Sequence, residues 1–499
     1  MQVAVVFTIF LSGGSFISAQ CLAQTSVNSL DQVYLQNLQF SELLQKNPTE
    51  LAQGFPDWLN SESIIAFSKL LANISPSDVV TGEVMASPQR ANPNYYYHWV
   101  RDAALTMDVV VRNYILSDAS ARGQWLPRIT NYIDFSRTNQ LSATAISGLG
   151  EPKFNPDGSP YMGDWGRPQN DGPALRALTA IRFARELLSE GQWDYVQSKL
   201  YDGQFPTNSL IKADLEYVAR HWSDLSFDLW EEVKGDHFYT RIVQAAALTQ
   251  GAALARTLND SGAGAFYDSQ AEAVINSLAS FWDPNLGMIR VTLNRVKGGE
   301  AKRGLDSAII LGVLHAGFKQ GPFTVLDSRV MATALKLETG FAAIYSVNDP
   351  ARFPNFGPAI GRYPEDIYSG TANLLQGNPW VLSTAALAQY YYELATMLNQ
   401  VSQFPIDDTN AAFLAHLALN GINVQPGLAF AHGSAEMGQL VQALMARGDL
   451  FMERIRLHEN VDGSLSEQID RNSGYMSSAR DLTWSYASFI TAQWARQSF

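Results

Sequence analysis

The sequence predicts an all-α protein assembled from paired helices. Apolar residues recur at helical spacing through a long succession of segments, each of which reads as an amphipathic helix. Hydrophobic residues make up 46% of the 499 residues and charged residues 17%, which is enough apolar material for one large packed core. No Gly/Ser-rich or Pro-rich linker divides the chain, so we expect a single domain. Periodicity alone leaves three architectures open: a bundle, a solenoid and a closed toroid of helix pairs.

The expected helices follow one another along almost the whole chain. In order they are residues 30–46, 58–74, 103–116, 124–139, 173–188, 208–221, 238–258, 269–281, 307–318, 329–339, 379–399, 410–419, 434–447 and 479–495. Loops rich in Gly, Pro, Asn and Asp separate them, and those at 148–172 and 348–378 are too long to be simple connectors. Long loops on a helical scaffold are where we expect a functional site.

The N-terminal residues have the pattern of a secretory leader. An apolar run at residues 3–11 precedes small residues, so a peptidase could cut near Ala23 and remove residues 1–23. We therefore expect a secreted or periplasmic protein, although no Lys or Arg precedes Lys46 and the leader has no basic n-region. The alternative is a buried N-terminal helix or strand. No later stretch approaches the ~20 apolar residues of a membrane span, so we expect no membrane partner.

Charge and motif content exclude several function classes. The chain has 35 Lys+Arg against 48 Asp+Glu, a formal net charge of −13, which argues against binding to nucleic acid. Cys21, the only cysteine, lies in the leader, so the rest of the chain can form neither an internal disulfide nor a thiolate metal site. The sequence has no HExxH spacing, Walker A motif, complete dinucleotide fingerprint or Asp-rich metal motif. We expect no metal and no cofactor.

Two adjacent carboxylates next to a tryptophan form the first candidate site. In the stretch FDLWEEV at residues 227–233, Glu231 and Glu232 follow Trp230. An indole that excludes water and a neighbouring anion both raise the pKa of a glutamate, which is what a general acid requires. The simpler alternative is a Glu-Glu pair in the first turn of a helix, where acidic residues are common.

A second carboxylate lies close to hydroxyl and amide groups. Glu467 belongs to the stretch GSLSEQ at residues 463–468, and SARDLTWSY follows at 478–486. Because such donors stabilise an ionised carboxylate, Glu467 is a candidate base. Alternatively, Glu467 is a solvated loop residue and Ser477 or Ser478 caps the last helix.

A third stretch combines aromatic rings with a guanidinium and a carboxylate. It reads NYYYHWVRD at residues 94–102, where Arg101 and Asp102 could make directed hydrogen bonds to vicinal hydroxyls. This is the chemistry of a sugar subsite, although a helix start with aromatic packing below it would look the same. The loops GDWGRPQNDG at 163–172 and GRYPED at 361–366 repeat the combination.

These five stretches, taken in their order along the chain, closely resemble the glucoamylases of glycoside hydrolase family 15. The resemblance begins near GEVMASP at residues 82–88 and continues to the C-terminal SARDLTWSY. It implies an (α/α)6 barrel, a six-hairpin toroid with the active site in its funnel. It also implies an exo-acting, inverting hydrolase that releases β-D-glucose from the non-reducing ends of α-1,4-glucans, namely starch, dextrins and maltooligosaccharides, with slower α-1,6 cleavage. The catalytic domain would span residues 24–499, with an N-terminal extension at about 24–57.

The resemblance also assigns roles to individual residues. Glu231 matches the family's general acid and Glu467 its general base, while Glu232 matches the neighbour that contacts the sugar on the leaving-group side. Arg101 and Asp102 match residues that grip the terminal glucose. The remaining matched substrate-binding positions are Arg362 on the same ring, the aromatic walls Tyr95, Trp99, Trp165, Trp380 and Trp484, Trp230 next to the acid, Leu229 through its carbonyl, and Ser478, which supports the base.

Departures from the family pattern limit these expectations. His98 stands where a threonine is common, Ile469 where a tyrosine is frequent, and the segment between Tyr368 and Gly377 is longer. Only five residues follow Trp494, so we expect no starch-binding domain and poor activity on granular starch. We also expect a monomer. Three alternatives remain: a glucodextranase-like or trehalase-like enzyme of the same fold, a non-catalytic carbohydrate-binding scaffold, and a helical terpene cyclase. The missing Asp-rich motif argues against the cyclase.

Overall fold

The structure is a computed structural model that describes residues 29–370 and 376–499. The predicted leader, Cys21 included, lies outside these residues. Within them, six helices form a ring in which each contacts the next and the last contacts the first. These inner helices are α3 (Val100–Leu116), α6 (Gly172–Ser189), α9 (Phe238–Thr257), α11 (Ala308–Ala316), α13 (Val381–Leu398) and α16 (Thr483–Gln497). The ring decides between the three architectures in favour of the closed toroid.

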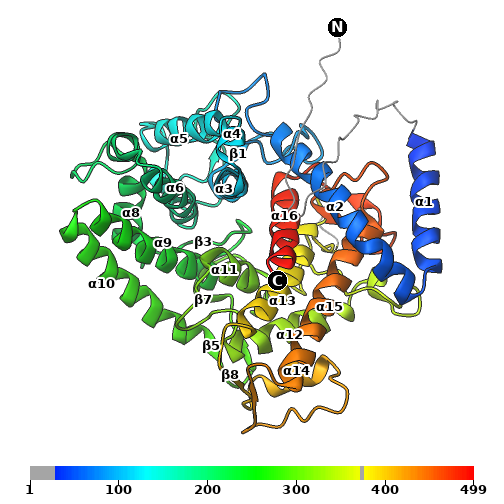
Figure 1. The fold of residues 1–499 in the computed structure, drawn as a ribbon. Coiled ribbons are helices and arrows are strands. Elements are labelled where there is room, and N and C mark those ends of the chain that lie inside the picture. Colours follow the sequence, from blue (N-terminus) through cyan, green and yellow to red (C-terminus); the bar gives the residue numbers. More distant parts are fainter. Residues whose placement is uncertain (1–28, 371–375) are drawn as a thin grey trace.

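An outer layer of helices packs against the ring. The outer partners of α3, α6, α9, α11, α13 and α16 are respectively α5 (Leu126–Gln140), α8 (Leu210–His221), α10 (Ser261–Leu278), α12 (Ser328–Ala342), α15 (Ala435–His458) and α2 (Pro48–Ala72). The colours of Figure 1 accordingly pass round the molecule from blue through green and yellow to red. The inner helices α9 and α13 are buried along nearly their whole length, whereas the outer helices bury one face. The predicted (α/α)6 barrel is confirmed.

Three helices extend at one end by two turns or more beyond the boundary that their apolar periodicity predicts. Helix α2 begins at Pro48 rather than at residue 58, because Asn47 and Glu50 form a reciprocal capping box and Pro48 occupies the first turn. Helix α10 begins at Ser261 rather than at 269, since the Asp260 side chain accepts from the backbone of its first turn. Helix α15 runs on to residue 458 rather than 447. The caps, not the hydrophobic pattern, set the first two boundaries.

Short strands that the sequence did not reveal lie in the loops between helices. They pair in small antiparallel sheets of two or three strands, and some partners, such as β1 with β2 and β4 with β7, are separated in sequence by whole helices. The sheets are β1 (His98–Trp99) with β2 (Lys153–Phe154), β3 (Ser226–Phe227) with β4 (Lys234–His237) and β7 (Thr292–Lys297), β5 (Trp282–Asp283) with β6 (Met288–Ile289), β8 (Gln403–Pro405) with β9 (Ala429–Ala431), and β10 (Gln468–Ile469) with β11 (Met476–Ser477). The short helical elements are α4 (Ala119–Arg122), α7 (Trp193–Tyr195), α14 (Ala411–His416), η1 (Gly148–Gly150), η2 (Val196–Leu200), η3 (Ala279–Phe281) and η4 (Ser346–Asn348).

Helix α1 (Ser29–Gln45) lies outside the barrel, at the edge of the molecule in Figure 1. The Gln36 amide donates to the carbonyl of Glu459 over 2.8 Å, and the Phe40 ring stacks on Tyr475 at 5.7 Å. The segment expected to precede the barrel, 24–57, thus contains both this peripheral helix and the first turns of α2. Among the described residues, no helix combines the length and the apolar character that a membrane span needs.

The six inner helices begin differently from most outer ones. In none of the six does the side chain of the N-cap residue accept a hydrogen bond from the helix, as the described residues show. Four outer helices have such a cap, made by Asn47, Asp260, Asp327 and Ser434. Backbone N–H groups at a helix start carry partial positive charge. All the predicted site residues lie in the loops before inner helices or in their first turn, so the barrel offers its positive ends to a site rich in carboxylates.

Candidate active site

The acid turn, residues 228–233, joins β3 to β4. Strand register pairs Phe227 with Lys234, so these six residues form the turn of a hairpin. The Asp228 carboxylate accepts from the backbone N–H groups of Glu232 and Val233 over 2.8 and 2.9 Å. Glu231 has a φ of 67°, in the left-handed region, which costs a non-glycine residue about 1–3 kcal/mol. The turn therefore holds Glu231 in a backbone conformation that it would not adopt alone.

Three neighbours converge on one oxygen of Glu231. Trp99 Nε1 donates to Oε1 over 2.7 Å, Gln169 Nε2 donates over 3.0 Å, and Arg101 Nη2 lies 3.6 Å away. The side chain stays 19% exposed. The indole that contacts this carboxylate belongs to Trp99, whereas the sequence suggested the adjacent Trp230; Trp230 Nε1 donates instead to Asp306 over 2.9 Å. Trp230 and Glu231 are therefore neighbours in the chain whose side chains have different partners.

Glu232 turns away from Glu231 and binds another arginine. Arg362 Nη2 donates to Glu232 Oε1 over 2.7 Å, and the Tyr363 hydroxyl donates to Oε2 over 2.6 Å. Arg362 also makes a bidentate contact with Asp366 at 2.8 and 2.6 Å. The charge of Glu232 is therefore balanced by Arg362, in an arrangement fixed on both carboxylate oxygens.

Glu467 lies at the foot of the β10–β11 hairpin. Because Gln468 pairs with Ser477, the residues Glu467 and Ser478 come opposite each other. The Ser478 hydroxyl and Gln468 Nε2 both donate to Glu467 Oε2, the second over 3.0 Å. Helix α16 begins only at Thr483, after Leu482, so neither serine caps it. Ser478, like Glu231, has a left-handed backbone, with a φ of 65°.

Burial and hydrogen bonding act on Glu467 in opposite directions. The residue is 1% exposed, and this burial raises the pKa of its carboxyl to about 7, while donors from Ser478, Tyr95 and Gln468 oppose the rise. The predicted donors are present. They do not outweigh burial, so Glu467 holds its proton to a higher pH than the sequence suggested.

Tyr95 connects the two carboxylates. Its hydroxyl lies 2.6 Å from that of Tyr368 and hydrogen-bonds to Glu467. Its ring lies 5.6 Å from the ring of Trp99, whose N–H reaches Glu231. A continuous set of contacts therefore runs from the base candidate to the acid candidate.

Arg101 and Asp102 occupy the first turn of α3. Arg101 Nη1 donates to Gln169 Oε1 over 3.0 Å and to Asp171 Oδ2 over 2.9 Å. Asp102 lies 3.6 Å from Arg101 Nε, and burial raises the pKa of Asp102 to about 7 although Arg101 opposes the rise. Both side chains are almost enclosed, as expected of groups that would grip a sugar ring in a confined site.

Tryptophan rings line the same region. Trp230 lies 5.4 Å from Trp380 and stacks on Trp484 at 6.4 Å, while Trp99 lies 6.0 Å from Trp165. The buried indole nitrogens of Trp165, Trp380 and Trp484 have no hydrogen-bond partner among the described residues. Leu229 is buried within the acid turn. Flat apolar faces next to free N–H donors suit a sugar ring and its hydroxyls.

The structure adds residues that sequence reasoning did not assign. Gln169 accepts from Arg101 and donates to Glu231. Its loop, residues 163–172, stood out in the sequence, but Gln169 itself was given no role. No sequence motif pointed to Lys153. Its Nζ lies 3.6 Å from the Trp165 ring centre and 4.6 Å from that of Trp99. Other additions are Asp171, Asp366, Tyr363, Tyr368 and Lys302. Across the described residues, no group of three or more His, Cys, Asp or Glu side chains could hold a metal ion.

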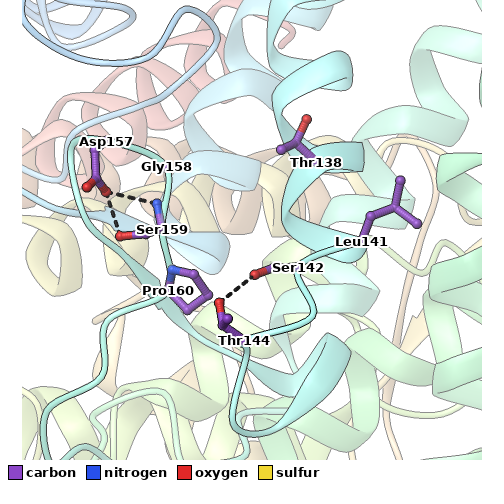
Figure 2. Close-up of a pocket in the computed structure, with 8 residues that line it drawn as sticks. All are labelled: Thr138, Leu141, Ser142, Thr144, Asp157, Gly158, Ser159 and Pro160. Atoms are coloured by element: carbon purple, nitrogen blue, oxygen red, sulfur yellow. Dashed lines mark hydrogen bonds between the residues drawn. The ribbon is translucent and has the colours of Figure 1, made fainter.

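A separate hollow lies away from these carboxylates. It has a volume of about 460 Å³ and lies between the end of α5 and the segment that follows β2, as Figure 2 shows. Its carboxylate, Asp157, accepts from the backbone and hydroxyl of Ser159. Its lining holds one carboxylate together with hydroxyls and no second carboxylate, so the hollow lacks the pair of acids that the candidate site has.

Comparison with known proteins places the chain among glycosidases. A family model described as glycosyl hydrolases family 15 matches residues 65–494. The chain is 36% identical to the glucoamylase of Blastobotrys adeninivorans, over 90% of this chain and 73% of that protein. It is 38% identical to glucoamylase 1 of Rhizopus oryzae, over 88% of this chain and 70% of that protein. The solved glucoamylase from Saccharomycopsis fibuligera superposes with a TM-score of 0.79 at 33% identity, covering 91% of this chain and 96% of that one.

Proposed function

The chain belongs to the glycosyl hydrolases of family 15, and from that premise we propose that Glu231 and Glu467 are the acid and the base of an inverting hydrolysis. The protein is a glucan 1,4-α-glucosidase, an exo-acting hydrolase that releases glucose from α-glucans such as starch. One observation carries the division of roles: Glu231 is partly exposed and held through one oxygen, whereas Glu467 is buried among donors.

Glu231 protonates the glycosidic oxygen. Trp99 and Gln169 both hold Oε1, which leaves Oε2 to carry the proton towards the leaving group. Glu231 is the more exposed of the two carboxyls, as a group must be if it exchanges protons with solvent after every turnover. The leaving sugar departs on the side of Glu232, whose carboxylate Arg362 and Tyr363 hold in place.

Glu467 takes the proton of the attacking water. Burial makes this carboxylate a stronger base than an exposed glutamate, and Ser478 and Gln468 orient it. In inverting enzymes the two carboxyl groups stand about 6.5–9.5 Å apart, so that a water fits on the far face of the ring. Water attack from that face converts the α-linkage into β-glucose. Tyr95, next to Glu467, would contact this water.

The remaining assigned residues bind the substrate. We assign Arg101, Asp102 and Arg362 to the hydroxyls of the terminal glucose, because each presents fixed charged donors or acceptors. Tyr95 and the tryptophans at 99, 165, 230, 380 and 484 supply ring surfaces, and Leu229 supplies a backbone carbonyl.

Proton NMR of a fresh reaction on maltotetraose tests the mechanism. β-Glucose should appear before mutarotation, together with maltotriose. Early α-glucose would overturn attack by an activated water on the far face. If maltotetraose is not cleaved at all, the exo-hydrolysis of α-1,4-linkages is wrong, and isomaltose and trehalose become the next substrates to assay.

Export, domain content and oligomeric state belong to the same proposal. Residues 1–23 are removed as a leader, residues 24–499 form one catalytic domain with its N-terminal extension, and the mature protein is a monomer. The apolar run at residues 3–11 and the single closed barrel support these statements. N-terminal sequencing of protein from the culture medium and light scattering after size exclusion test them.

A further inference from the structure

We propose that Lys302 is a positioning residue for the general acid, because its ammonium ties together the two aspartates that hold the acid turn. Lys302 Nζ lies 3.1 Å from Asp228 Oδ2 and 3.1 Å from Asp306 Oδ2, and its side chain is 6% exposed. The proposal rests on the assignment of Glu231 as the acid. Lys302 lies in the segment between β7 and α11, far in sequence from the turn that it supports.

The first aspartate fixes the backbone of the turn. Asp228 Oδ1 accepts from the N–H groups of Glu232 and Val233, while its carbonyl accepts from the N–H of Glu231 over 2.9 Å. These bonds enclose Glu231 in its left-handed conformation. A buried carboxylate can serve as this acceptor at little cost only when a cation balances its charge, and Lys302 is that cation.

The second aspartate and a tyrosine connect Lys302 to both neighbours of the acid. Asp306 accepts from Trp230 Nε1 over 2.9 Å, so it fixes the residue before Glu231. The Lys302 ammonium also lies 4.0 Å above the ring of Tyr363, whose hydroxyl donates to Glu232, the residue after Glu231. One buried cation therefore reaches the turn through three separate contacts.

The segment that carries Lys302 lies directly against the acid turn. Gly298 has a φ of 74°, and a Cβ at this position would collide with the carbonyl oxygen of Glu232. The close approach requires glycine here. Because this segment packs against the backbone of the acid turn, a shift of Lys302 would also shift the turn.

Removing the ammonium should have a pH-dependent effect on the reaction. The charged and titratable groups around it are Asp228, Glu232 and His237 from the hairpin, Asp306 from the loop just before α11, and Arg362 with Tyr363. Without Lys302, Asp228 and Asp306 face each other with no cation between them. Burial then favours their neutral forms at low pH, whereas at high pH the two anions repel each other and the turn loosens.

The test is kcat and KM of Lys302→Met across the pH range with a soluble maltooligosaccharide. We expect kcat to fall about 10–100-fold, since a displacement near 1 Å costs about that much, with a much smaller change in KM. The ratio of wild-type to variant kcat should grow as pH rises. Arg303→Met is the matched control: Arg303 is 87% exposed and 3.9 Å from Glu365, so its loss should change neither constant.

A second variant separates positioning from folding. Lys302→Met combined with Asp228→Asn removes one charge of each sign and keeps an acceptor at Oδ1, so it should recover much of the lost kcat at high pH. A folded double variant that is no better than Lys302→Met, or a Lys302→Met protein that matches the wild type at every pH, would overturn the proposal. Glu231→Gln is measured alongside: if it keeps full turnover, the proposed acid is wrong whatever Lys302 does.

Discussion

Glu231 and Glu467 both lie at β-hairpins, yet the protein holds them differently. Glu231 occupies the middle of a turn, 19% exposed, and bears the left-handed backbone itself. Glu467 lies just before the first strand of its hairpin, 1% exposed, and its partner Ser478 has the left-handed backbone instead. The difference suits the two tasks, because an acid must exchange its proton with solvent and a base works best when water is excluded from all but one side.

The two carboxyls also differ in where their partners come from. Glu231 depends on Trp99, Gln169 and Arg101, which belong to other loops of the barrel. Glu467 depends mainly on Gln468 and Ser478 of its own hairpin. Changes in distant loops should therefore disturb the acid more than the base.

The largest effect should come from removing either carboxyl. Glu231→Gln and Glu467→Gln keep the side-chain shape, and each should lower kcat on maltooligosaccharides by at least about 10²–10⁴-fold, since positioned acid–base catalysis typically contributes that much. Thermal unfolding of both variants serves as the control for folding. A folded Glu231→Gln enzyme with near wild-type turnover would contradict the assignment of Glu231 as the general acid.

A smaller effect should follow when the acid loses its indole donor. Trp99→Phe keeps a ring but removes the N–H that holds Glu231 Oε1. We expect kcat to fall about 10-fold, because this hydrogen bond strengthens as Glu231 gives up its proton and becomes charged. Trp165→Phe is the comparison variant: it removes an N–H that has no protein partner in the described residues, and because Trp165 is assigned to the substrate, we expect it to raise KM and to leave kcat nearly unchanged. Equal losses of kcat in the two variants would show that ring packing, rather than the hydrogen bond, is what matters.

The base should respond mainly in its pH profile. Ser478→Gly removes a donor that lowers the pKa of Glu467, and glycine accepts the left-handed backbone at this position. The pKa of Glu467 should rise further, so the low-pH limb of kcat/KM, where the base becomes protonated, should move to higher pH by about one unit. Ser477→Ala should leave the limb in place. Movement of the high-pH limb instead would assign Ser478 to the acid.

Glu83, a buried carboxyl outside the site, tests the effect of burial on stability alone, because its substitution should not change kcat. Neither oxygen of Glu83 has a hydrogen-bond partner in the described residues, and burial raises the pKa of its carboxyl to about 8. In the unfolded protein the pKa of this carboxyl is about 4.3, so below that pH Glu83 is neutral in both states and its burial costs little. As pH rises from there towards 8 the carboxyl ionises only when the protein unfolds, and this contribution to stability is lost. Glu83→Gln should therefore raise the melting temperature at pH 8 and much less at pH 4. An equal shift at both values would contradict the titration of Glu83.

Amphipathic periodicity predicted most of the helices, apart from the ends of α2, α10 and α15, and the order of the long motifs predicted the family and, through the resemblance, the toroid. The sequence could not predict that Trp99 rather than Trp230 contacts Glu231, since the contact crosses between loops. Nor could it predict that burial outweighs the donors around Glu467. Lys302 carried no local pattern, because its partners Asp228 and Asp306 come together only when the hairpin packs against the start of α11.

The division of labour between the two carboxyls is tested most directly with α-D-glucosyl fluoride. Fluoride leaves without protonation, so the substrate needs the base but not the acid. Glu231→Gln should therefore hydrolyse the fluoride at a rate near that of the wild type while failing on maltose, and Glu467→Gln should fail on both. A Glu467→Gln enzyme that hydrolyses the fluoride normally, with Glu231→Gln inactive on it, would reverse the assignment.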